Sequence, residues 1–158
     1  MSSRTIPLHD LEGRWHIVLS NFPMWLKGDK TGPSLNYAVE IKGTVTGLRD
    51  EVISQKRGKP QSIVGFDTPL DIANTRFLWR GKGLLSLLTS RWEIVHLEAH
   101  LQWAIIHFEK TLFTPEGYDV IARSKHLSPE MLADIQSALR ECGITSPLQP
   151  IPQEINSK

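Results

Sequence analysis

Apolar and polar residues alternate with a period of two along most of the chain. In residues 15–19, tryptophan, isoleucine and leucine occupy every second position, and residues 35–41 repeat the pattern. This alternation is typical of strands whose two faces meet different surroundings. The pattern predicts strands at 15–19, 35–41, 49–55, 62–67, 75–79, 92–97, 102–108 and 118–123.

Glycine and proline interrupt the pattern between the predicted strands, as at 28–33, 58–60, 81–83 and 115–117. Eight short strands separated at regular intervals are typical of an all-β barrel or a β-sandwich. Closure into a barrel removes the unpaired edges that an open sheet exposes.

The segment after the last strand predicts one helix over residues 129–142. Ser128 is a typical N-cap, Pro129 suits the first helical position, and Glu130 favours the positive end of the helix dipole. Apolar residues, Cys142 among them, then recur at steps of three and four. We expect this face, including the thiol, to pack on the barrel wall, and the tail 144–158 to run extended and fray at its end.

Composition narrows the possible functions. The 158 residues fit one domain, with a barrel over about 12–124, and the formal net charge of +1 argues against nucleic acid as a partner. The single cysteine excludes an internal disulfide and zinc sites that need two cysteines. Because neither a membrane-spanning apolar window nor an early signal-like run is found, we expect a cytoplasmic protein.

Three short motifs resemble those of the lipocalin family. Residues 13–15, Gly-Arg-Trp, match its G-x-W motif; residues 89–92 occupy the place of T-D-Y; and Arg123 ends the last strand as the family's arginine does. The chain looks similar to the branch that contains bacterial lipocalins, plant temperature-induced lipocalins and apolipoprotein D. Ser90 and Arg91 depart from the family pattern, and the paired cysteines of secreted members are absent.

The resemblance implies an eight-stranded, antiparallel, up-and-down barrel with one C-terminal α-helix packed on its wall. It also implies that Arg123 packs over Trp15, beside Gly13, and closes one end of the barrel. A guanidinium on an indole face gains a cation–π contact, and its donors suit the carbonyls of the N-terminal segment. The ligand is then expected toward the opposite end.

Family geometry and alternation together predict the residues that line the barrel and bind a ligand. These are Tyr37, Val39, Val52, Phe77, Trp79, Trp92, Ile94 and Ile121. The face of strand 102–108 stays open, because a slip of one residue reverses it. Simple pairing around the preceding turn puts Trp103, Ile105 and His107 inside, whereas family alignment favours Ala104 and Ile106.

His96 and Asp119 are the polar residues predicted to point into the same space. A carboxylate in an apolar barrel must find a partner or take up a proton, and a nearby histidine is such a partner. Together they would be the catalytic pair if the protein is an enzyme. The alternative is that both lie near the mouth and are solvated.

Residues 81–89 form an apolar loop that contains Leu84, Leu85, Leu87 and Leu88. Buried, the leucines would form a lid over the pocket. Exposed, they would mark a homodimer interface or a weak membrane contact.

The common nucleophile, zincin and phosphate-loop motifs are missing from the sequence, so we expect no cofactor and no metal site. Two functions follow. The first is an intracellular protein that binds a small hydrophobic molecule in its barrel. The alternative is a cofactor-independent isomerase or cyclase that acts on an apolar biosynthetic intermediate. A fold alone does not separate them.

Overall fold

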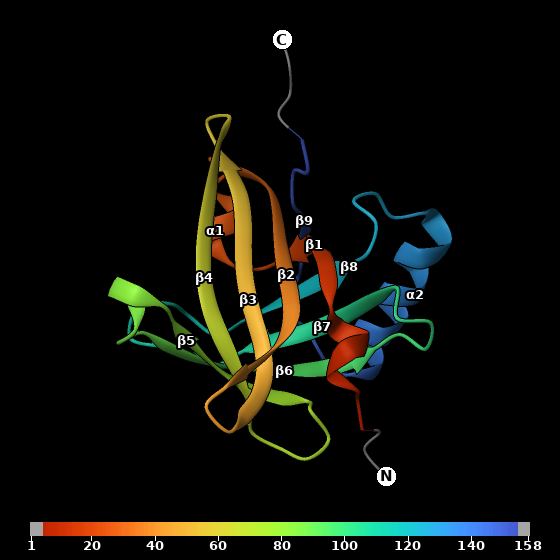
Figure 1. Cartoon of the computed structure of the whole chain (residues 1–158). Coiled ribbons are helices and arrows are strands. Elements are labelled where there is room, and N and C mark those ends of the chain that lie inside the picture. The colour runs from red at the N-terminus through yellow and green to blue at the C-terminus, as the bar shows by residue number, and fades with distance from the viewer. Residues whose placement is uncertain (1–4, 155–158) are drawn as a thin grey trace.

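The computed structural model describes residues 5–154 and contains a closed antiparallel barrel (Figure 1). Each strand pairs with the next along the chain, and β1 pairs with both β2 and β8, which closes the sheet. The predicted eight-stranded up-and-down barrel is therefore confirmed. The strands are β1 Gly13–Ser20, β2 Lys30–Lys42, β3 Val45–Lys56, β4 Lys59–Pro69, β5 Arg76–Gly81, β6 Thr89–Leu97, β7 Trp103–Phe108 and β8 Gly117–Ala122.

The predicted C-terminal helix is α2, Pro129–Glu141. The Ser128 hydroxyl accepts a hydrogen bond from the Met131 amide at 3.1 Å, which caps the first turn. Ile135, Ala138 and Leu139 pack against the outside of the barrel. Cys142 is exposed, so its predicted packing is wrong, because the buried stripe ends one turn earlier.

Three short helical segments lie before or between the strands: η1 Leu8–Leu11 precedes β1, α1 Pro23–Leu26 follows it, and η2 Gly83–Leu85 lies between β5 and β6. No helix within residues 5–154 has the length and apolar character needed to cross a membrane. In the part of the tail that the structure describes, β9, Gln149–Pro150, pairs with the end of β1. The predicted fraying at 155–158 lies outside the described residues.

Two β-bulges break the strict alternation of faces. In β1 the register shifts between Ile17 and Leu19, and in β6 it shifts between Ile94 and His96. A bulge adds one residue to one strand, so every side chain beyond it changes face. Leu19 consequently packs in the cluster beneath α2, although simple alternation groups it with Trp15 and Ile17.

Trp15 and Arg123 close the end of the barrel at which β1 begins. Trp15 is fully buried and donates from Nε1 to the Leu11 carbonyl at 2.9 Å. The Arg123 guanidinium carbon lies 3.6 Å from the centre of the Trp15 ring. Its nitrogens also donate to the carbonyl oxygens of Asp10, Glu12 and Arg14 at 2.9–3.2 Å.

Gly13 makes this close approach possible. Its φ is +100°, and a Cβ at this position would lie 3.1 Å from Arg123 Nη1. The motif residue is therefore required by the backbone conformation and by the arginine above it.

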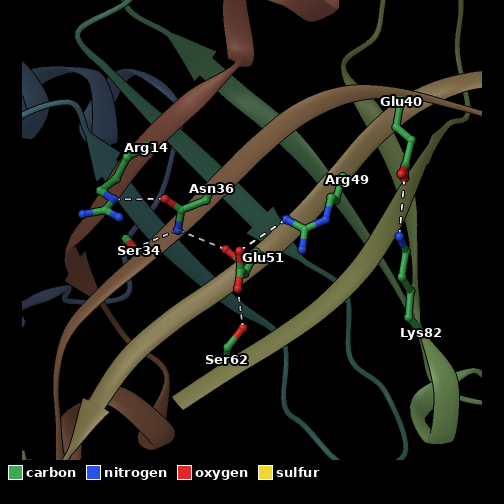
Figure 2. A network of polar contacts seen from close by, with 8 residues as sticks. All are labelled: Arg14, Ser34, Asn36, Glu40, Arg49, Glu51, Ser62 and Lys82. Atoms are coloured by element: carbon green, nitrogen blue, oxygen red, sulfur yellow. Dashed lines mark hydrogen bonds and ion pairs between the residues drawn. The ribbon is translucent and has the colours of Figure 1, made fainter. Parts of the chain in front are cut away.

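The outer face of β1–β4 carries a network of paired polar groups (Figure 2). Arg14 donates to Asn36 at 3.0 Å, and the Asn36 side-chain amide donates to the Glu51 carbonyl oxygen at 3.1 Å. The Glu51 carboxylate accepts from Ser62 and lies 3.3 Å from Arg49. These hydrogen bonds hold the pKa of Glu51 below its ordinary value. Every charge in this network thus has a partner.

Candidate functional site in the barrel interior

The eight residues predicted to bind a ligand lie together in one cluster inside the barrel. Four of them are buried there: Tyr37, Phe77, Trp92 and Ile121. The other four, Val39, Val52, Trp79 and Ile94, are partly buried and pack against the same cluster. The structure therefore brings the whole predicted set into one place.

The open question about β7 has a clear answer. Ala104 and Ile106 belong to the interior cluster, whereas Trp103 and Ile105 pack beneath α2. The prediction from family alignment, which put Ala104 and Ile106 inside the barrel, is therefore correct. The prediction from simple pairing around the turn is wrong. The cause is the bulge in β6, which pairs Ile94 with Ile106 and His96 with Ile105.

Trp92 is the centre of an aromatic stack. Its ring lies 4.6 Å from that of Phe77 and 5.9 Å from that of Tyr37, with interplanar angles of 19° and 9°. Stacked aromatic side chains present flat apolar surfaces that suit a hydrophobic ligand. They also fill the interior with the protein's own rings.

The segment 21–29 covers the end of the barrel opposite Trp15. Phe22 and Trp25, the latter from α1, are buried in the interior cluster. Phe22 meets Phe108 edge-on at 5.6 Å, and a Cβ on Gly117 would lie 2.5 Å from the Phe22 ring. Leu84 and Leu87 of the 81–89 loop are instead almost fully exposed. The mouth is therefore covered by Phe22 and Trp25, not by these leucines.

Three carboxyl groups share the interior with these aromatic rings. Asp50 on β3, Asp67 on β4 and Asp119 on β8 are 5%, 0% and 2% exposed. Among the described residues, none of the ion pairs includes any of the three. This separates them from the paired acids of the outer face, since a buried carboxylate without a partner is strongly disfavoured.

Asp50 and Asp67 are buried carboxyls on the neighbouring strands β3 and β4, and one oxygen of each, Asp50 Oδ1 and Asp67 Oδ2, has no hydrogen-bond partner within residues 5–154. Burial raises the pKa of Asp50 to about 6, and the neighbouring Asp67 limits the rise. The pKa of Asp67 lies well above its ordinary value because of burial first and the Asp50 charge second. Trp92 Nε1 donates to Asp67 Oδ1 at 3.0 Å. Two adjacent carboxyls cannot both ionise easily, so the pair as a whole keeps a proton well above the ordinary pKa of an aspartate.

Asp119 lies opposite Ser20 on the neighbouring strand β1. Burial raises the pKa of Asp119 to about 7, and the hydrogen bond with Ser20 opposes the rise. Its Oδ1 is buried and lacks a hydrogen-bond partner. At neutral pH this carboxyl is therefore divided between its protonated and ionised forms.

The Tyr37 hydroxyl lies within electrostatic range of all three acids. Burial raises its pKa well above the ordinary value, and the charges of Asp50, Asp67 and Asp119 raise it further, in that order. The geometry agrees for two of the acids, because Asp50 lies directly opposite Tyr37 on β3, and Asp67 accepts from Trp92, whose ring stacks on that of Tyr37.

His96 does not meet Asp119. Beyond the β6 bulge its ring stacks on Trp103 at 5.2 Å, and Trp103 belongs to the cluster beneath α2. The predicted inward position of His96 is therefore wrong, because alternation ignores the inserted residue. The buried partner of Asp119 is Ser20, which the β1 bulge turns inward.

Asp50 and Asp67 were not predicted as site residues. For Asp50 a signal existed, since it lies two positions before the inward-facing Val52. Asp67 is the last residue of the predicted strand 62–67, and the sequence pattern does not show which face of this strand points inward. Its contact with Asp50 joins β4 to the neighbouring strand β3. Only the register of β3 against β4 shows that Asp50 and Asp67 are close together.

The structure also contains two surface clefts, and neither is lined by Asp50, Asp67 or Asp119. One, of about 330 Å³, lies between the β6–β7 turn and the start of α2 and is lined by residues that include Glu98, Trp103 and Asp134. The other, of about 210 Å³, is lined by Ile6, Thr75 and the second half of β6. Across residues 5–154, no group of three or more histidine, cysteine or acidic side chains is arranged to hold a metal ion.

The closed barrel, the trailing helix and the tryptophan–arginine closure define the lipocalin fold, and solved structures share it. Per a 4, a major allergen from cockroaches, matches with a TM-score of 0.69 at 11% identity over 98% of this chain and 92% of that chain. Lobster apocrustacyanin A1 matches at 0.67 and 11%, over 93% and 79%. The siderocalin Ex-FABP matches at 0.66 and 15%, over 93% and 97%. No family model and no curated protein matches the sequence.

Proposed function

We propose that the protein binds a small hydrophobic molecule inside its barrel. The observation that carries the proposal is the single interior cluster in which aromatic rings surround a few polar groups. Such a combination is typical of ligand sites, and barrels of this size hold one small ligand. The similar siderocalin Ex-FABP is itself described as having dual ligand specificities, which supports a binding role.

Entry of a ligand requires movement at the mouth. The interior is packed, and Phe22 and Trp25 cover it from segment 21–29. We propose that this segment moves outward and that the ligand then takes the place of these rings beside Trp92. Segment 21–29 contributes no strand to the barrel, so its movement leaves the sheet intact.

Replacing Trp92 or Trp79 by alanine is expected to weaken binding of an apolar ligand such as decan-1-ol by about tenfold, because each ring supplies contact area. Native mass spectrometry and fluorescence titration measure the affinity. Trp103→Ala is the matched control, since Trp103 is a buried tryptophan outside the barrel. Unchanged affinity in both interior variants, or an equal loss in the control, would contradict the assignment of the pocket.

Asp119 favours a second candidate, a cofactor-independent isomerase or cyclase. A carboxyl whose pKa is about 7 is suited to both taking and returning a proton at neutral pH. On a β,γ-unsaturated ketone, the carboxylate would take a proton from the α carbon. The double bond would move into conjugation, and the carboxyl would return the proton to the γ carbon.

The enzymatic candidate predicts that Asp119→Asn lowers the isomerisation rate of an apolar β,γ-unsaturated ketone by about 100-fold. Ultraviolet absorbance of the conjugated product measures the rate. His96→Ala is the control and should keep its activity, because His96 packs on Trp103 outside the interior cluster. Equal rates for the wild type and Asp119→Asn would exclude this role for Asp119.

Three finer proposals accompany the binding function. The motifs support a kinship with the bacterial, plant temperature-induced and apolipoprotein-D-like branch. The single cysteine supports an intracellular location, which cell fractionation tests.

The exposure of Leu84 and Leu87 supports self-association or membrane contact. Sedimentation of the wild type and of Leu84→Ser, with and without vesicles, tests that contact.

A further inference from the structure

We propose that the ligand carries a protonated amine, which binds among Asp119, Asp50 and Asp67 beside the Tyr37 hydroxyl. This inference rests on the proposed binding function and specifies its chemistry. It assigns the polar end of the ligand to the carboxyl groups and the apolar remainder to the aromatic stack around Trp92.

The arrangement of the carboxyl groups is the first support. Asp50 lies directly opposite Tyr37 in the pairing of β2 with β3, and Asp67 Oδ1 accepts from the Trp92 indole, whose ring stacks on that of Tyr37. Asp119 lies opposite Ile106, which belongs to the same interior cluster. Three acids directed at one region form a site of concentrated negative charge once their protons leave.

The missing counter-charge is the second support. Within residues 5–154, none of the ion pairs reaches these acids, and Asp119 Oδ1 is buried without a partner. A buried polar atom in this state is strongly disfavoured unless a partner arrives. An ammonium group brings both a positive charge and up to three N–H donors, which match several carboxylate oxygens.

The aromatic surroundings are the third support. Tyr37, Phe77 and Trp92 lie in one stack beside the acids. Faces of aromatic rings attract cations, most strongly where water is excluded. A ligand with a carboxylate or phosphate head would instead meet like charge, so the site selects against lipids with acidic heads.

Three ligands of equal chain length test the inference: decylamine, decan-1-ol and decanoate. Calorimetric titration of the full chain at neutral pH gives the three affinities. Decylamine is expected to bind at least about tenfold more tightly than decan-1-ol, and decanoate more weakly than either, because only the amine pairs with the buried charge.

Aspartate variants test whether the preference for decylamine over decan-1-ol comes from the interior carboxyl groups. Asp119→Asn and Asp50→Asn are each expected to remove most of the amine preference and to keep the affinity for decan-1-ol, which verifies an intact barrel. Glu51→Gln is the matched control, since Glu51 follows Asp50 in β3 but bonds to Ser62 on the outer face. The control should keep the full preference.

The failures of the two proposals are distinguishable. Equal binding of decylamine and decan-1-ol would overturn the amine inference and leave hydrophobic binding in place. An amine preference that persists in both aspartate variants would also overturn it, because the cation would then bind elsewhere. Absence of binding by all three ligands would overturn the proposed function itself, and the amine inference with it.

Discussion

The free energy of unfolding is expected to fall as the pH rises from about 5 to about 8. Burial raises the pKa of Asp50 to about 6 and of Asp119 to about 7, and raises that of Asp67 further. In that interval the folded chain binds more protons than the unfolded chain, so deprotonation favours unfolding. Asp119 alone accounts for about 3 kcal/mol of this fall, because its folded carboxyl keeps a proton over about two pH units, from pH 5 to its pKa of about 7, at 1.36 kcal/mol each.

Several carboxylates and one histidine determine how the free energy of unfolding changes at lower pH. Hydrogen bonds and nearby charge lower the pKa values of Glu12 and Glu51, and those of Asp71 and Glu98 are lowered as well. Their stabilisation is present above the unfolded pKa and is lost below about pH 4. Burial also lowers the pKa of His16, so its charging destabilises the fold in acid. Stability should therefore be greatest near pH 5.

Denaturant titrations at a series of pH values measure this dependence. Asp119→Asn should reduce the slope and raise the stability at about pH 8, because the amide needs no proton to remain neutral. Glu51→Gln should leave the slope above about pH 5 unchanged, since the Glu51 carboxylate titrates in the acidic range. A stability that rises between these two pH values would mean that the interior carboxyls are not buried as described.

Trp15→Ala is expected to lower the free energy of unfolding by about 4 kcal/mol, through loss of apolar contacts and creation of a cavity. Trp15 is fully buried in the interior cluster, and the substitution also removes its hydrogen bond to Leu11 and its contact with Arg123. A loss of this size is comparable to the whole stability of a small domain. Arg14→Ala is the control, because the exposed neighbour should change stability by only about 0.5 kcal/mol.

Arg123→Lys tests the closure more finely. Lysine keeps the charge but lacks the planar fork that reaches three carbonyl oxygens at once. We expect a loss of about 2 kcal/mol in the same denaturant titration. Lys125→Ala, after the end of β8, should have little effect. Equal stability of the wild type and Arg123→Lys would show that charge, rather than shape, closes the barrel.

The periodic pattern predicts the barrel well because each strand buries one face. All eight predicted strands overlap observed ones, and α2 begins at the predicted Pro129. The alternating pattern does not reveal the extra residues that form β-bulges. The bulges at Ile17/Leu19 and Ile94/His96 reverse the face of Leu19 and His96, and nothing in the residue types marks them. The predicted catalytic pairing of His96 with Asp119 fails for this reason alone.

The apolar part of the candidate site follows from alternation, whereas its acidic part does not. Tyr37, Phe77 and Trp92 lie where a period of two puts them. The contact between Asp50 and Asp67 depends on the register of β3 against β4, in which Leu48 pairs with Asp67 and Asp50 with Gly65. Cross-strand register is a tertiary property, so residue patterns within one strand do not contain it.

Isoleucine methyl chemical shifts can show whether the ligand binds inside the barrel or beneath α2. Ile105 and Ile106 are neighbours on β7 that point to opposite sides of the sheet. On titration with decan-1-ol, we expect the methyl signals of Ile106 and Ile121 to shift and those of Ile105 and Ile135 to stay unchanged. Shifts confined to Ile105 and Ile135 would place the ligand beneath α2 and contradict binding inside the barrel.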